Sequence, residues 1–185
     1  MSAKKLLEAF RERYGGKVAS SAVNLFARRP SWKGDIRGRL VEIEVIDGDL
    51  LEVDTRCSSG GFFLSLTPRS VYRGLSALWA RMFRGASFDP DPEFDRAFLI
   101  QTNDAERMCT GLGDAAVRTM IMQVENLKLL RVQSGVLTIR KVQRHVDEST
   151  LGEVWNLVDL ACRLAIVVEK SLGAFVKRES PPEGG

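Results

Sequence analysis

Apolar and polar residues alternate along two pairs of segments, and a short turn sequence separates the members of each pair. The four segments are residues 40–46, 49–57, 127–133 and 136–143. Asp47-Gly48 joins the first pair, and Ser134-Gly135 joins the second. A period of two on both sides of such a turn is typical of an antiparallel β-hairpin. The sequence therefore predicts two hairpins.

Both ends of the chain carry apolar residues at helical spacing. Near the N-terminus, Ser2 is placed to cap a helix that Gly15-Gly16 would end. Near the C-terminus, Ser149 is placed to cap a long helix whose apolar stripe reaches about Phe175. The sequence therefore predicts a first and a last helix that each present one apolar side to a sheet.

Two shorter helices are expected between the hairpins, at residues 104–108 and 114–124. Gly111 and Gly113 separate them, and Asp114 is placed to cap the second. The letters GLGDAA at residues 111–116 also fit the G-x-G-x-x-A pattern of a dinucleotide-binding loop. That loop must follow a strand directly, and here about eight residues, including NDAERMCT, intervene after the predicted strand. We therefore interpret the segment as a turn and a helix cap.

The order of these elements predicts the fold class. FFLSL at residues 62–66 and AFLIQ at residues 97–101 are expected to add short strands. Helices follow and precede hairpins instead of alternating with single strands, which is typical of an α+β fold. We expect about four helices that pack either on two antiparallel hairpin-based sheets or on one mostly antiparallel sheet.

We expect residues 1–175 to form a single domain, or two lobes with a boundary near residues 86–96. Asp89-Pro90-Asp91-Pro92 lies at that boundary and enforces an extended or turning chain. Its alternate carboxylates suggest a calcium loop, but the prolines contradict that pattern, so a cap for a short helical turn at residues 92–96 is favoured. Residues 176–185 are polar and rich in proline, and we expect a disordered tail.

The segment DPEFDRAFLI at residues 91–100 precedes a helix, a hairpin and a long terminal helix. In this order the chain resembles an uncharacterised bacterial protein family, and the resemblance covers about residues 35–170. It implies a compact bacterial domain. It implies no activity and no catalytic residue.

The composition is that of a globular protein, with 185 residues, 44% hydrophobic residues and a net charge of +3. Residues 1–88 carry 15 Lys/Arg against 9 Asp/Glu, whereas residues 89–185 carry 12 against 15, so the positive charge lies in the first half. Three widely spaced cysteines, in apolar surroundings, and a single histidine, His145, argue against a disulfide framework and against a metal site. We expect a cytoplasmic protein without an export signal, a transmembrane segment or a cofactor.

The segment TPRSVYRGLSALWARMFRG, residues 67–85, predicts an amphipathic helix that begins at Thr67-Pro68. Its arginines fall on one side and its large apolar residues on the other. Covering the apolar side against the sheet is worth about 1.5–3 kcal/mol for each large side chain, which favours a core helix over a membrane-bound one.

Basic residues in the first half still form a candidate surface for an anionic membrane or a nucleic acid. RRPSWK is expected to be a loop in which a tryptophan among cations can stack on a base or enter a membrane interface, although a solvated basic rim without a ligand is the favoured interpretation. The candidate residues are Arg28, Arg29, Trp32, Lys33, Arg69, Arg73, Arg81 and Arg84.

Three functional hypotheses follow. The first is a non-catalytic binding module that acts through a protein partner or self-association, because the core is well patterned and no reactive residues cluster in the sequence. The second is binding of an anionic surface through the basic half. The third is an enzyme with its site at the seam between the two lobes. No catalytic, cofactor-binding or metal-binding residue is singled out by a motif.

Overall fold

The structure is a computed structural model that describes residues 2–24, 27–46, 49–71, 90–143 and 149–179, without side-chain detail at residues 20–28 and 172–179. Its strands are β1 (Lys17–Asn24), β2 (Ala27–Ile36), β3 (Arg39–Ile46), β4 (Leu50–Arg56), β5 (Leu64–Pro68), β6 (Phe98–Thr102), β7 (Leu127–Gln133) and β8 (Val136–Val142). Its helices are α1 (Ala3–Tyr14), the 3-10 turn η1 (Arg69–Val71), α3 (Pro92–Ala97), α4 (Ala105–Gly111), α5 (Ala115–Met122) and α6 (Thr150–Glu179).

All described strands belong to one antiparallel sheet in the order β1-β2-β3-β4-β8-β7-β5-β6. The two predicted hairpins, β3–β4 and β7–β8, are both confirmed, and they join through a long-range pairing in which Val53 lies opposite Ile139. Ser134 and Gly135 both have positive φ, as a tight hairpin turn requires. The predicted α+β class is therefore confirmed, with one sheet instead of two.

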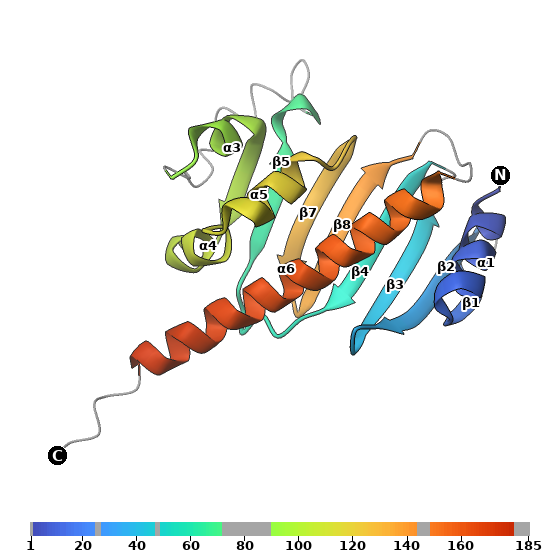
Figure 1. The fold of residues 1–185 in the computed structure, drawn as a ribbon, viewed down its shortest axis with the longest axis horizontal. Helices are drawn as coiled ribbons and strands as arrows, with labels where there is room; N and C mark the ends of the chain where they lie inside the picture. The colour runs from blue at the N-terminus through green and yellow to red at the C-terminus, as the bar shows by residue number, and fades with distance from the viewer. Residues whose placement is uncertain (1, 25–26, 47–48, 72–89, 144–148, 180–185) are drawn as a thin grey trace.

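The sheet has an inner face that the described helices cover (Figure 1). Alternate residues of the central strands, such as Val41, Val53 and Ile139, point into this layer and are fully buried. Helix α6 lies diagonally across β4 and β8, while α1 covers the β1–β2 end and α3, α4 and α5 cover the β5–β6 end (Figure 1). The buried residues of the sheet and the helices form one continuous core. Among the described helices, none is long and apolar enough to cross a membrane.

The helix ends follow the predicted capping residues. The Ser2 hydroxyl accepts a hydrogen bond from the Lys5 amide, and Gly15 has a positive φ just after α1. Asp114 accepts from the Ala116 amide at the start of α5, which confirms the turn-and-cap interpretation of GLGDAA. The last helix continues beyond the predicted end near Phe175, to Glu179.

The segment at residues 17–36 differs from the prediction. The sequence predicts no strands there and a loop for RRPSWK, but the segment forms the antiparallel pair β1–β2 at one edge of the sheet. Small residues such as serine and alanine, together with Pro30, weaken the alternation of apolar and polar residues by which strands are recognised in a sequence. Pro30 lies just beyond the last residue of β2 that pairs with β3, where its missing amide hydrogen breaks no pairing with that strand.

Trp32 fixes this edge to the rest of the core. Its ring is fully buried on the inner face, meets Phe10 of α1 edge-on with 4.9 Å between ring centroids, and donates its indole N–H to the Gly15 carbonyl at 2.8 Å. Trp32 therefore packs as a core residue, and its predicted stacking role on a ligand or membrane is wrong. Glycine is required at two neighbouring positions, because a Cβ on Gly16 or Gly34 would lie only 2.7 or 2.4 Å from ring atoms of Trp32.

The segment at Thr67–Gly85 is described only in part. Strand β5 continues through Thr67 to Pro68 and is followed by η1, so Thr67 is not the helix cap that we predicted. Residues 72–89, which hold most of the predicted amphipathic helix and the start of the predicted lobe boundary, lie outside the described residues.

A substitution of Gly34 by alanine is expected to destabilise the fold. The new Cβ would collide with the buried Trp32 ring, and relief would require the ring to leave its position and the hydrogen bond to Gly15. We expect a loss of about 1–3 kcal/mol in the free energy of unfolding, measured by urea denaturation. Gly152→Ala is the matched control, because its added Cβ meets nothing within 4 Å apart from its chain neighbours and the backbone of its own helix. Equal stability of both variants would contradict the proposed packing.

Candidate functional site

A cleft of about 380 Å³ opens between the end of α5 and the first half of α6. Its apolar wall consists of Met120, Val124, Leu157 and Leu160. Its polar groups are Gln123, Glu125, Lys141, Glu153, Asn156 and Asp159. The volume falls in the usual range of small-molecule sites, roughly 300–1,000 Å³, and the mixture of an apolar wall with a few polar groups is typical of them. This cleft is the candidate functional site.

Lys141 lies at the bottom of the cleft. The alternation of β8 turns Leu137, Ile139 and Lys141 to the inner face, so a lysine takes a position where the neighbouring residues of that face are apolar. Lys141 is only 5% exposed, between the strand partners Leu51 and Leu127. Buried lysines are rare because removing an ammonium from water is costly. A functional or structural requirement must therefore offset this cost.

The Lys141 ammonium forms an ion pair with Glu153 on the first turns of α6, at 2.7 Å between Nζ and Oε2. The Glu153 side chain is 44% exposed and forms part of the rim, whereas the lysine side chain is almost fully enclosed. The pair thus joins the bottom of the cleft to its opening.

Asp159 is held on the other side of the cleft. Its carboxylate pairs with Arg37 in the turn between β2 and β3 and with Arg163 one turn further along α6, the latter at 2.7 Å. Arg37 has a positive φ of 57°, so this tight turn brings its guanidinium towards α6. The two arginines neutralise Asp159, which leaves a fixed carboxylate with limited exposure at the wall.

A further ion pair holds the second half of α6 on the sheet. Arg39, the first residue of β3, binds both carboxylate oxygens of Glu169, with 3.0 Å between Nη1 and Oε1. The Ser58 amide also donates to Glu169 Oε1 at 3.0 Å. The hydrogen bonds from Arg39 hold the pKa of Glu169 below its usual value, and those to Glu169 raise the pKa of Arg39. This bidentate geometry orients the helix against the start of β3.

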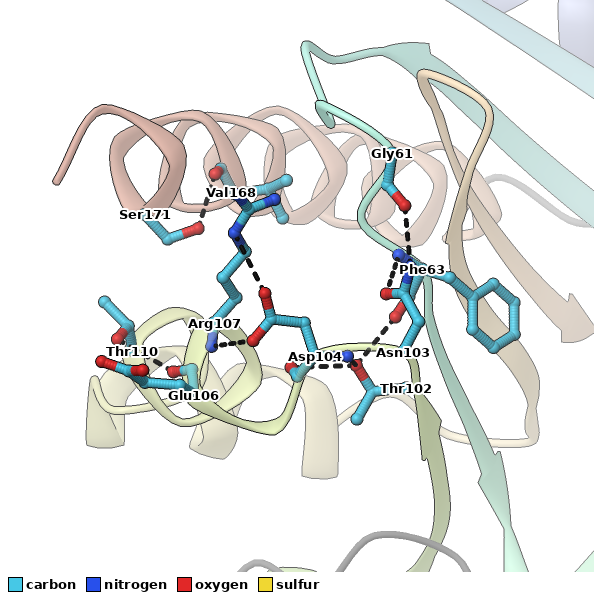
Figure 2. A network of polar contacts seen from close by, with 10 residues as sticks. All are labelled: Gly61, Phe63, Thr102, Asn103, Asp104, Glu106, Arg107, Thr110, Val168 and Ser171. Carbon is cyan, nitrogen blue, oxygen red and sulfur yellow. Dashed lines mark hydrogen bonds and ion pairs between the residues drawn. The ribbon is translucent and has the colours of Figure 1, made fainter. Parts of the chain in front are cut away.

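A separate polar network surrounds the start of α4 (Figure 2). Asp104 caps the helix by accepting from the Arg107 amide at 3.0 Å and also pairs with the Arg107 guanidinium. The Asn103 side chain donates to the Gly61 carbonyl and accepts from the Phe63 amide, both on the loop that follows β4. These contacts connect backbone groups of two segments that are distant in the sequence. The network is accordingly structural.

The predicted basic surface residues are placed as follows. Arg28 and Arg29 lie on β2, and Arg29 is partly buried; nothing is described of the Arg28 side chain. Lys33 is exposed but pairs with Glu42 at 2.7 Å, and Arg69 donates to the Asp95 carbonyl at 3.3 Å. Arg73, Arg81 and Arg84 lie outside the described residues. Binding of an anionic surface through this set stays a prediction, without the contribution of Trp32.

The carboxylates of the predicted linker serve a structural purpose where they are described. Asp91 accepts from the Phe94 amide at the start of α3 and pairs with Arg118 of α5 at 2.7 Å, contacts that lower its pKa. Asp91 therefore caps the predicted turn. No group of three or more potential metal ligands occurs within the described ranges, and His145 lies outside them.

The cleft and its central ion pair, Lys141 with Glu153, are not among the features predicted from the sequence. One signal was available, since Lys141 interrupts the apolar register of a strand at a position of the same parity as Leu137 and Ile139. Glu153 carries no comparable signal. Its meeting with Lys141 depends on the path of α6 across the sheet.

A comparison of the whole chain with solved structures finds a similar fold. The fold matches that of TtfA, a mycobacterial trehalose monomycolate transport factor. The match has a TM-score of 0.59 and covers 91% of this chain and 93% of that chain, at 10% sequence identity. At this identity the likeness to TtfA concerns the fold alone. No protein-family model and no curated protein matches the chain, so the resemblance of residues 35–170 to a bacterial family stays a prediction.

Replacement of Glu169 by glutamine is expected to weaken the attachment of α6 in a pH-dependent way. The lowered pKa of Glu169 in the folded state means that its charge stabilises the fold above the pKa of the unfolded chain, about 4.3. This stabilisation is lost as the pH falls through the folded-state pKa. At neutral pH we expect a loss of about 1–2 kcal/mol.

Urea denaturation at neutral pH measures the loss of stability. The same measurement at a pH well below the carboxyl pKa tests whether that loss depends on the charge. The difference between the wild type and Glu169→Gln should shrink at the lower pH. Glu8→Gln is the control, because Glu8 forms only an exposed pair with Lys4 at 3.7 Å and should change stability by less than about 0.5 kcal/mol. A loss for Glu169→Gln that is the same at both pH values would contradict the role of the charge.

The three cysteines are expected to differ in reactivity. All are free; Cys57 and Cys162 are buried, while Cys109 is exposed, which corrects the sequence expectation that all three lie in apolar surroundings. Burial raises the pKa of Cys57 to about 11 and also raises that of Cys162. Because the thiolate is the reactive form, iodoacetamide should label only Cys109 rapidly in the native protein and all three in denaturant. Unchanged labelling of native Cys109→Ser would overturn this assignment.

Proposed function

We propose that the chain is a non-catalytic binding module that docks to a protein partner in a transport complex. The observation that carries this proposal is the fold match to a protein named as a transport factor, which extends over nine-tenths of both chains. The arrangement of ionisable groups on the helical side of the sheet agrees with it. Asp91, Asp104 and Glu169 each satisfy helix caps or ion pairs, so their geometry serves the fold.

Helix α6 is the element that we propose for partner docking. Its 30 residues correspond to a length of about 45 Å, and its C-terminal end extends beyond the sheet (Figure 1). Covering the sheet does not require this additional length. Ile166 is 38% exposed on α6, and Lys170 is exposed one turn further along the same side. Both residues flank Glu169, which holds this part of α6 on the sheet, and an apolar residue beside a long side chain on the exposed side of the helix suits a protein surface.

Site-specific photo-crosslinking in the native cells tests this function. A benzophenone amino acid at position 166 or 170 should produce the same crosslinked product, identified by mass spectrometry. The same probe in place of Lys4, which is exposed on α1, is the control and should not produce this product. A product that contains only peptides of this chain would identify a second copy as the partner. No product from position 166 or 170, or the same products from position 4, would contradict the proposal.

A further inference from the structure

We propose that the cleft between α5 and α6 binds a neutral ligand rich in hydroxyl groups, of the chemical class of sugars and sugar headgroups. This inference is independent of the proposed partner surface, because Ile166 and Lys170 do not line the cleft. It rests on the arrangement of donors and acceptors at different depths of the cleft.

The bottom of the cleft offers hydrogen-bond donors. A lysine ammonium has three N–H donors and no acceptor. Within the described part of the chain, the Lys141 ammonium has one acceptor, Glu153 Oε2 at 2.7 Å. Donors that stay unsatisfied at a buried site are costly. An occupant therefore gains from placing acceptor oxygens next to Lys141.

The rim and walls offer mainly acceptors. Carboxylates of Glu125, Glu153 and Asp159 line the cleft, together with the side-chain amides of Gln123 and Asn156. Glu125 and Asn156 are exposed at the opening, and Glu153 reaches from the rim to Lys141. An occupant must therefore present donors towards the rim while it presents acceptors towards the bottom.

Ionic ligands meet only one of these requirements. An anion would accept from Lys141, but Glu153 already neutralises that ammonium, and the Glu125 carboxylate at the opening would repel the anion. A cation would find Glu153 and Asp159 already paired, and it would approach a buried ammonium and leave the lysine donors without further acceptors. A hydroxyl group both donates and accepts without carrying a charge. Several hydroxyls on one rigid frame can satisfy both levels of the cleft together.

The apolar wall supports the same class of ligand. Met120 and Val124 from the α5 side and Leu157 and Leu160 from α6 give the cleft apolar lining, and a sugar ring has C–H faces that can pack on such a surface. The volume of about 380 Å³ suits a ligand of about the size of a single sugar ring with a short attached group. A free sugar and the headgroup of a glycolipid share this chemistry.

An NMR titration of the full chain tests the proposal and separates these two sources. The probes are D-glucose, n-octyl-β-D-glucoside below its micelle concentration, octanoate and octylammonium. We expect saturable amide shifts around residues 120–125, 141 and 153–160 with at least one of the two neutral probes. Binding of both would indicate that the sugar suffices, whereas binding of the glucoside alone would indicate a glycolipid. Stronger binding of octanoate or octylammonium, or saturable shifts from neither neutral probe, would overturn the proposal.

Three variants localise the binding. Asn156→Trp should fill the cleft from an exposed helix position and abolish the saturable shifts, whereas Ile166→Trp, exposed on the same helix outside the cleft, should leave them unchanged. Lys141→Met should weaken binding about tenfold through loss of the buried donor. Should Lys141→Met fail to fold, Asn156→Trp still decides the question. Saturable binding that survives Asn156→Trp would place the ligand elsewhere and refute the assignment.

Discussion

The fold depends on burial of one apolar face of a broad sheet beneath a layer of helices, in which the long helix α6 covers the central strands. Each large side chain buried in that layer contributes about 1.5–3 kcal/mol, and the buried residues of α6 and the central strands form one continuous core. This contribution is not directional, since it depends on area and not on the angle of the helix. Helix α6 could slide or rotate on such a face unless other contacts held it.

Ion pairs restrict the angle at which α6 crosses the sheet. Glu153, Asp159 and Glu169 follow one another along α6 and pair with three different places on the sheet: Lys141 of β8, Arg37 in the β2–β3 turn and Arg39 of β3. Each is a charged contact with limited exposure of at least one partner, so its geometry is restricted. The three pairs together determine how α6 crosses the strands.

The candidate cleft is a consequence of this crossing. Where α6 passes over β8, the end of α5 does not fill the space beside it, and the ion pair of Lys141 with Glu153 faces that space. The same contact that orients the helix thus places a buried ammonium in an accessible cleft. An orienting contact of the helix and a candidate binding site thus share one residue pair, Lys141 and Glu153, in an otherwise apolar register.

The sequence by itself determined the elements whose causes are local. Alternation and turn residues specified β3–β4 and β7–β8, and the capping residues Ser2 and Asp114 specified helix starts, because each depends on neighbours within a few positions. Only the tertiary structure decided the β1–β2 edge, the pairing of β4 with β8 and the meeting of Lys141 with Glu153. Weak alternation around Pro30 becomes a strand because the edge of the sheet and the buried Trp32 support it. The cleft depends on the angle at which a helix crosses a sheet, and contacts between residues far apart in the chain set that angle.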